Sequence, residues 1–319
     1  MKRFFTFFIS LVIIGLAGIF LKTGNCGMFK QKIPFKPPGT VYYSNGVNLF
    51  RFTFESLPKT EIIAEGKLNP SFSKKRQKII FGHADVWICD KNGKNKRRLK
   101  EAGNGEPVLS PDEDKIAYTT HNGELGIIYL NNGERDEIIA EDCLPYDIIV
   151  WISNDELIYT KGIWPLDTKI KRWYECMPGT RTQININTKQ KREFRYKKIY
   201  PGTLSPDGQY LLCSKKSSFY ELGAIYLLQV QDMKLTKLTR CGGFPHTFIW
   251  SPDGRYFLFC KYRHPLISLL HGAFELMDIY VYSLEHKKMY RLIENTALFG
   301  GFWLEEEEDL VGVRPRKQN

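Results

Sequence analysis

A short turn motif recurs along this 319-residue chain and constrains its fold more than any other feature. The three clearest copies place Ser-Pro-Asp after a Leu or Trp, at residues 109–112, 204–208 and 250–254, and a short β-rich run follows each. Proline presets the first turn position, the Asp side chain caps the turn, and Gly accepts the positive φ where the chain reverses. The motif therefore predicts tight hairpins in which each Asp has a structural role.

Three degenerate copies of the motif, at residues 72–75, 151–155 and 302–306, extend the series to six. The serines at positions 73, 110, 153, 205 and 251 are 37, 43, 52 and 46 residues apart. A repeat period of this size is typical of propeller blades or of a solenoid, and the hairpin character of the motif favours blades.

A second hairpin alternates with the first and consists of a hydrophobic strand, a turn and a more polar outer strand. Its six copies begin near residues 47, 85, 126, 182, 224 and 278. Six hairpins of each kind predict an all-β, six-bladed β-propeller with four strands in each blade. The chain opens with an outer hairpin at 47–63 and closes with an inner one at 302–313, so we expect the two ends to complete one blade and close the ring.

The Leu/Trp-Ser-Pro-Asp-Gly turns, together with the segment DVWICDKNG…RRL at residues 85–99, resemble the TolB-type propeller repeat. The resemblance covers residues 45–313 and implies a six-bladed propeller, frequently extracytoplasmic. The periplasmic translocation protein of that family carries an α/β domain before its propeller, for which this chain has no room. Similar repeats occur in prolyl-oligopeptidase-like peptidases, whose hydrolase domain and Gly-x-Ser-x-Gly motif are missing here, and in oligogalacturonate lyases, where histidines on one face hold a metal.

The first forty residues are interpreted as a targeting segment followed by a linker. Lys2 and Arg3 precede an uncharged, largely apolar run at residues 4–21, which has the pattern of a secretory signal and just reaches the length of a spanning helix. No good small-residue cleavage site follows, so an uncleaved anchor is favoured. We therefore assign residues 1–25 as a signal peptide or hydrophobic anchor helix, 26–40 as a linker and 41–319 as the propeller, and expect an extracytoplasmic domain in the cell envelope.

Charge and cysteine content exclude several classes of protein. The net charge is +11, but residues 1–40 hold six basic residues and no acidic one, so the excess in the rest of the chain is small and no nucleic-acid partner is expected. The seven cysteines include no Cys-x-x-Cys pair, which excludes a zinc ribbon or thioredoxin motif. Cys89, Cys213 and Cys260 are expected to be buried thiols, whereas Cys143 and Cys176 would lie near one face of one blade, where an extracytoplasmic location would permit a disulfide.

Histidines are the strongest hint of chemistry, because five of the six map to one predicted face of the ring. They are His83, His121, His246, His264 and His271. Neutral imidazole is the commonest protein ligand for transition metals, so a centre formed by His83, His246 and His264 is the alternative to a face without metal. No His-Glu-x-x-His pair supports such a centre, and no cofactor is expected.

Two long insertions, at residues 160–181 and 262–276, map to the same face and bring exposed aromatic and basic side chains. The candidate ligand-binding residues there are Trp164, Trp173, Tyr174 and Arg263, together with His83, His121, His246 and His264. No nucleophile–base set or phosphate loop is visible, so we expect a binding module for a protein or a cell-envelope glycan, tethered to the membrane by residues 4–21. The alternative is a metal-dependent polysaccharide lyase, for which Lys261 and Arg263 are the nearest basic candidates.

Overall fold

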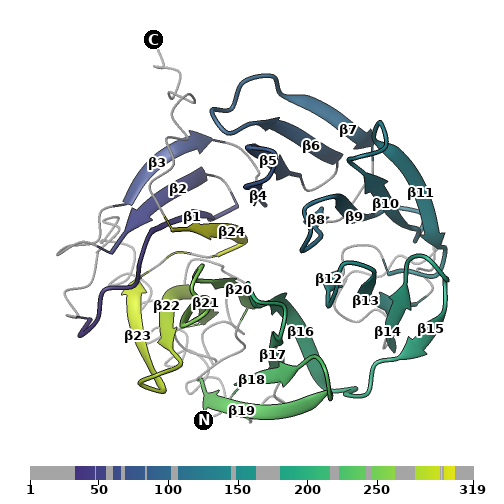
Figure 1. Cartoon of the computed structure of the whole chain (residues 1–319). Helices are drawn as coiled ribbons and strands as arrows, with labels where there is room; N and C mark the ends of the chain where they lie inside the picture. The colour runs from purple at the N-terminus through teal and green to yellow at the C-terminus, as the bar shows by residue number, and fades with distance from the viewer. Residues whose placement is uncertain are drawn as a thin grey trace, which may run out of the picture.

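The computed structural model describes residues 33–46, 48–54, 60–65, 69–82, 85–101, 107–144, 149–162, 180–215, 223–241, 246–262, 277–294, 296 and 298–305. Within these ranges the chain forms six antiparallel four-stranded sheets arranged around a ring (Figure 1). The predicted anchor at residues 4–21 lies outside the described residues. In the part of the chain that is described, no helix has the length and hydrophobicity needed to cross a membrane.

Each sheet is one blade, and its first strand lies nearest the centre of the ring. Blades one to three consist of β24 (Gly300–Leu304), β1 (Thr40–Ser44), β2 (Asn48–Thr53) and β3 (Thr60–Glu65); β4 (Ser71–Ser73), β5 (Lys78–Phe81), β6 (Asp85–Asp90) and β7 (Arg97–Glu101); and β8 (Val108–Leu109), β9 (Lys115–Thr119), β10 (Leu125–Tyr129) and β11 (Arg135–Ala140). Blades four to six consist of β12 (Val150–Trp151), β13 (Glu156–Lys161), β14 (Thr180–Asn185) and β15 (Lys191–Glu193); β16 (Ile199–Leu204), β17 (Tyr210–Lys215), β18 (Ala224–Gln229) and β19 (Lys234–Arg240); and β20 (His246–Trp250), β21 (Tyr256–Tyr262), β22 (Met277–Ser283) and β23 (Lys288–Ile293).

Blade one joins the two ends of the chain, which confirms the predicted closure of the ring. β24 pairs antiparallel with β1, so that Phe302 lies opposite Tyr42. The sequence predicted that residues 302–313 supply both inner strands of this blade. In the structure, β24 supplies only the first strand, and β1 supplies the second. The Thr-Val-Tyr-Tyr-Ser sequence of β1 is rich in β-branched and aromatic residues, and all five of its residues are buried.

The hydrophobic core is divided into six clusters, each between two neighbouring blades. Val41 of blade one packs with Leu258 of blade six, for example, and Ile80 of blade two packs with Tyr118 of blade three. Strand β21 shows how one strand serves two clusters, because Tyr256 and Leu258 pack toward blade one whereas Phe257 and Phe259 pack toward blade five. Adjacent blades thus stabilise one another, and the ring has no weakly packed end.

The Ser-Pro-Asp turns form as predicted. In the copy at residues 250–254, Ser251 Oγ donates a hydrogen bond to Asp253 Oδ1 at 2.6 Å, and the same oxygen accepts the Arg255 N–H at 3.1 Å. Gly254 has a φ of +68°, the left-handed conformation that the turn requires. The copies at Asp112 and Asp207 repeat these contacts, so these carboxylates cap turns.

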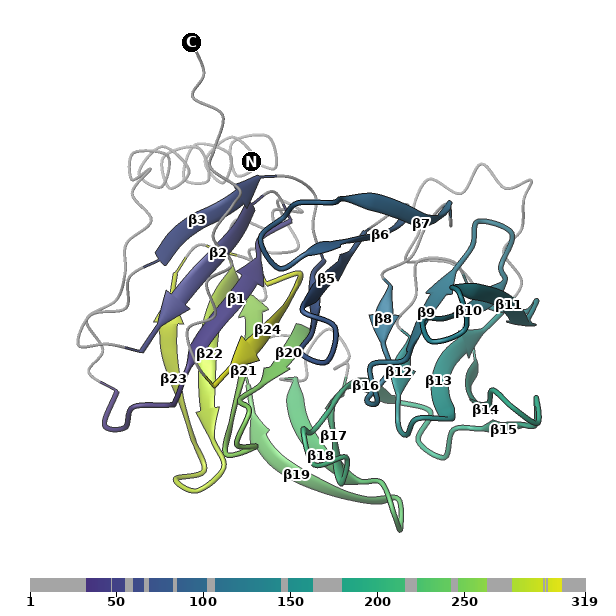
Figure 2. The same cartoon turned by 45° about the horizontal axis from the view of Figure 1, so that its top comes forward.

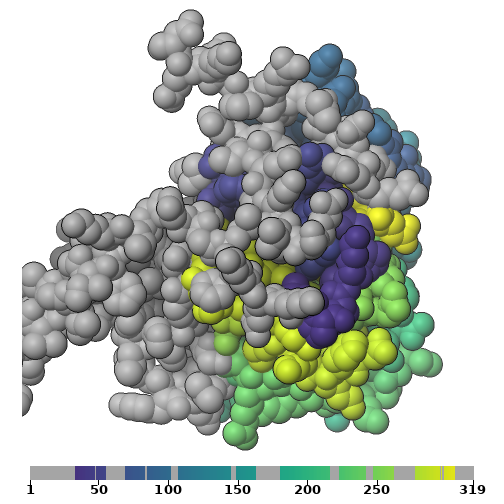
Figure 3. Space-filling view, turned by 90° about the vertical axis from the view of Figure 1, so that its left-hand side faces the viewer, coloured from purple at the N-terminus to yellow at the C-terminus, as the bar shows by residue number. Residues whose placement is uncertain are grey.

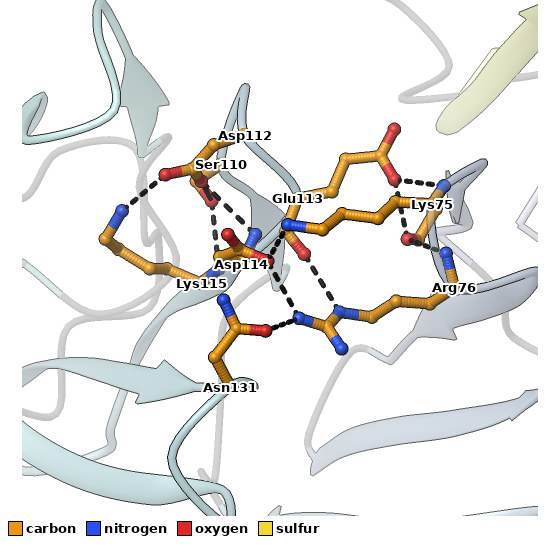
Figure 4. Close-up of polar contacts among 9 residues, drawn as sticks. Lys75, Arg76, Ser110, Asp112, Glu113, Asp114, Lys115 and Asn131 are labelled. Atoms are coloured by element: carbon orange, nitrogen blue, oxygen red, sulfur yellow. Dashed lines mark hydrogen bonds and ion pairs between the residues drawn. The ribbon is translucent and has the colours of Figure 1, made fainter.

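One of these turns also locks two blades together (Figure 4). Glu113 Oε2 accepts hydrogen bonds from Ser73 Oγ and from the Lys75 N–H, both at 2.7 Å. Asp114 forms ion pairs with Lys75 and with Arg76, whose guanidinium group also reaches Asn131. The turn of blade three therefore holds the turn of blade two, which gives Glu113 and Asp114 a structural role.

Candidate functional site

The topology separates two faces of the ring. The Ser-Pro-Asp turns and the turns before each outer strand lie on one face, which we call the lower face. The connections between the second and third strands of each blade, and those from one blade to the next, lie on the opposite, upper face (Figure 2). The connections at residues 82–85, 119–125, 161–180 and 262–277, which carry most of the predicted site residues, therefore begin and end on the upper face.

The structure describes only a part of the predicted site. His121 is exposed in the turn between β9 and β10, on the upper face. The backbone of His246 begins the inner strand β20 and pairs with Cys260. The other predicted residues lie outside the described residues: His83, Trp164, Trp173, Tyr174, Arg263 and His264.

A polar cluster lies at the upper end of blade six, where β21 ends and β22 begins. Asp278 is directly opposite Lys261 in the sheet, and its side chain is completely buried. The guanidinium group of Arg291 lies 3.5 Å from Asp278 Oδ2 and 2.7 Å from Glu294 Oε1. Two basic and two acidic groups thus meet at the base of the connection at 263–276, and a buried carboxylate of this kind requires such partners.

Lys261 is the most unusual group in this cluster. Its amine lies 4.5 Å from the centre of the Tyr280 ring, an arrangement that favours a cation. Burial nevertheless lowers the pKa of Lys261, and the negative charge of Asp278 opposes this shift. The amine is therefore a half-buried cation that loses its proton more readily than a surface lysine.

A second polar cluster lies at the upper end of blade four, at the base of the other insertion. Asp142 accepts a hydrogen bond from the hydroxyl of the fully buried Tyr159 at 2.7 Å, and Lys191 and Lys161 lie 2.9 and 3.4 Å from its carboxylate oxygens. Although burial opposes ionisation, the contacts with Lys191 and Tyr159 hold the pKa of Asp142 below its ordinary value. Burial and the same aspartate raise the pKa of Tyr159, which therefore stays protonated.

All five cysteines in the described ranges are buried in the folded protein. Cys89, Cys213 and Cys260 are buried in strands, as the sequence predicts. Cys143 is also buried, beside the blade-four cluster, but Cys176 lies outside the described residues, so their pairing stays a prediction. Burial raises the pKa of Cys241 to about 11, which keeps this thiol protonated and unreactive at neutral pH.

The two clusters hold their charges in mutual contacts, so they fix the strand ends from which the two long connections start. In the described ranges, no three His, Cys, Asp or Glu side chains are grouped to hold a metal ion. Asp142, Asp278 and Arg291 are not among the residues that the sequence predicts for this face. The signal was available for Asp278, because an acidic residue directly preceding Ile-Tyr-Val-Tyr interrupts a hydrophobic strand and requires a buried partner.

No protein-family model and no curated protein matches this sequence. Among solved structures, the chain is similar to TolB from Acinetobacter baumannii, with a TM-score of 0.61, 14% identity, and coverage of 85% of this chain and 67% of that one. It is also similar to a putative TolB from Agrobacterium tumefaciens, with a TM-score of 0.54, 12% identity, and coverage of 83% and 94%. An oligogalacturonate lyase from Vibrio parahaemolyticus overlays more loosely, with a TM-score of 0.47, 11% identity, and coverage of 80% and 84%. The chain therefore has the six-bladed propeller fold of the TolB proteins, as its repeats predict.

Proposed function

We propose that this chain is an extracytoplasmic, membrane-tethered propeller that binds a protein partner or an envelope glycan through its upper face. The observation that carries the proposal is the position of the two long insertions. Both connections, at 162–179 and 263–276, start from the upper face, and each starts directly beside one of the two polar clusters. A rigid ring that presents long connections from well-anchored strand ends is a typical binding scaffold.

The paired strand ends permit a clean test of this face. Lys161 lies opposite Thr180, and Tyr262 lies opposite Met277, so each insertion can be replaced by a two-residue Asn-Gly turn while the flanking pairs are kept. A photo-crosslinking residue at His121 would report on the upper face in cells. The same residue at Asn132, which is exposed in the lower-face turn of the same blade, is the matched control.

We expect crosslinks from position 121 that disappear when either insertion is replaced, and few crosslinks from position 132. Equal crosslinking at both positions, or crosslinking that survives both replacements, would contradict the proposal. Location is tested separately by adding protease to cells: digestion only after rupture of the cytoplasmic membrane would show that the domain is cytoplasmic.

The metal-dependent lyase remains the alternative from another class. It requires His83, His246 and His264 to converge, and only the backbone of His246 is described. Metal analysis of the purified protein, compared with His246→Ala, separates the two functions. A bound metal that is lost in the variant would favour the lyase, whereas metal content unaffected by the substitution would favour the binding module.

A further inference from the structure

Charge is distributed unevenly around the ring. The described residues between 107 and 144, which form blade three, include nine Asp and Glu but only two Lys and Arg. Those between 180 and 241, which form blade five and the outer half of blade four, include eleven Lys and Arg but only three Asp and Glu. The net charge of the whole chain therefore conceals one acidic region and one basic region.

The acidic side is neutralised by its neighbours. Glu134 of blade three pairs with Arg97 of blade two, and Glu137 pairs with Lys189 of blade four at 2.6 Å. Lys100 and Lys191 likewise pair with Asp136 and Asp142. The acidic outer edge of blade three is thus held between two basic edges, which stabilises the ring.

On the basic side, Lys189, Lys191, Arg192 and Lys197 pair with carboxylates, but several other cations have no such partner in the described part of the chain. Six side chains near blade five form no ion pair with any residue that the structure describes; we call them the basic rim, and they are Arg195, Lys198, Lys215, Lys234, Lys237 and Arg240. All except Lys215 are exposed, and Lys215 is partly exposed. Leaving several like charges together without counter-charges destabilises the folded state slightly, so an external anionic partner is a physical reason for them.

The basic rim is continuous from the edge of blade four to the upper end of blade five. The hydroxyl of Tyr196 donates to the carbonyl of Met233 at 2.7 Å, which brings the segment around Arg195 next to Lys234. Lys215 lies opposite Ile199, directly beside Lys198. Along β19, Lys234 and Arg240 are separated by roughly 20 Å of extended strand. The cations are therefore spread over a broad convex edge and do not converge on one point.

The segment that follows the predicted anchor lies on the neighbouring blade. Phe35 stacks on Tyr256 with ring centroids 5.0 Å apart, and it also contacts His286 and Tyr290, all in blade six. Figure 3 shows the purple surface, which includes this segment and blade one, against the yellow surface of the C-terminal strands, with green surface beside it. Blade three, the acidic one, lies across the ring from blade six (Figure 1).

We propose that the basic rim rests on an anionic phospholipid surface, so that the propeller lies with the edge of blade five toward the membrane and its upper face open to partners. This rests on the membrane tether of the proposed function. The eleven residues between Leu21 and Ile33 reach at most about 40 Å, so a tethered ring stays close enough for its charges to act. The acidic blade three is two blades away from blade five in the ring, so it does not lie against the negative surface. A broad row of cations also matches a flat anionic layer better than a compact ligand.

The test uses the full chain reconstituted in vesicles of phosphatidylcholine alone, or with about 30 mol% phosphatidylglycerol. Brief labelling with an amine-reactive reagent, followed by mass spectrometry, measures the exposure of Lys198, Lys215, Lys234 and Lys237. Lys74 and Lys94 are the matched controls, because they are exposed on blade two, across the ring from blade five, and also lack ion pairs with described residues. We expect labelling of the rim lysines to fall about three-fold or more on anionic vesicles only, and to recover at about 0.5 M salt, where screening is strong.

Two charge-reversed variants sharpen the result. Lys234→Glu with Lys237→Glu should abolish the protection of Lys198 and Lys215, whereas Lys74→Glu with Lys94→Glu, which changes the net charge equally, should leave it intact. Equal labelling on both vesicles, equal protection of Lys74, or protection by a soluble acidic polysaccharide but not by anionic vesicles would overturn the proposal. Extraction of the vesicles at alkaline pH reports on the tether alone, so failure of the tether is distinguished from failure of the rim.

Discussion

The ring of Tyr118 on β9 lies directly over Gly126, its cross-strand partner on β10: a β-carbon at Gly126 would be 2.2 Å from the tyrosine Cζ. Because the glycine leaves this space, the fully buried tyrosine crosses the third strand and its hydroxyl donates to Asp136 on β11. Asp136 also pairs with Lys100 of blade two. One glycine therefore permits a link that runs through blade three to its neighbour.

Gly126→Ala should destabilise the protein by about 1–3 kcal/mol, because the new methyl group occupies the space of a packed aromatic ring. Urea unfolding measures the effect. The matched control is a double-mutant cycle with Tyr118→Leu, which removes the ring. In that background the cost of the alanine should be much smaller, and additive costs would show that the steric explanation is wrong.

Asp253→Ala should cost about 1–2 kcal/mol, because it removes the acceptor for both Ser251 Oγ and the Arg255 N–H in a turn that is part of the blade. Asp253→Asn retains one carbonyl oxygen and should cost less. Thermal or urea unfolding distinguishes the two variants. An alanine variant as stable as the wild type would show that the turn does not depend on its carboxylate.

The same aspartate should make stability depend on pH. Although burial opposes ionisation, hydrogen bonds from Ser251 and Arg255 hold the pKa of Asp253 below its ordinary value of 3.8. The unfolded state therefore takes up the proton first on acidification, so the contribution of Asp253 is fully present above about pH 5 and declines as pH falls through the lower, folded-state pKa. The stability difference between wild type and Asp253→Asn should shrink between about pH 5 and pH 2, and a constant difference would contradict this explanation.

Closure of the ring should require β24 but not the residues after position 305. A chain that ends at residue 299 lacks β24, so it exposes the edge of β1 and loses the buried Trp303, whose indole N–H donates to the Pro38 carbonyl at 2.7 Å. Such a chain should lose its cooperative unfolding transition, as measured by circular dichroism on heating. A chain that ends at residue 305 keeps β24 and is the matched control; the prediction fails if the two chains unfold alike.

The sequence predicted the fold well because the physical causes are local. Each turn copy carries its own Ser, Pro and Asp, and the structure confirms that Ser205 and Asp207 bond as the pattern requires. The assignment of the closing strand failed at β1, because one short strand after a proline-rich segment resembles a linker when its pairing partner is about 260 residues away in sequence.

The candidate site was less predictable because its contacts are not local. Asp278 and Arg291 lie on neighbouring strands, and Asp142 meets Lys191 from another blade. The separation of these residues in the sequence does not predict that either pair is in contact. The face itself was predictable, since strand order alone determines which connections share it, but the distances between its side chains depend on how the blades twist and pack.

Asp278→Asn should make Lys261 more reactive. Burial already lowers the pKa of this amine, and the negative charge of Asp278 opposes the shift, so its removal should lower the pKa further and enlarge the neutral, nucleophilic fraction near pH 8. The rate of labelling by an amine-reactive reagent across pH, read by mass spectrometry at Lys261, measures the change, and the exposed Lys94 serves as the internal reference. A reactivity profile for Lys261 that does not shift relative to Lys94, in a variant whose circular dichroism matches the wild type, would show that Asp278 does not control this amine.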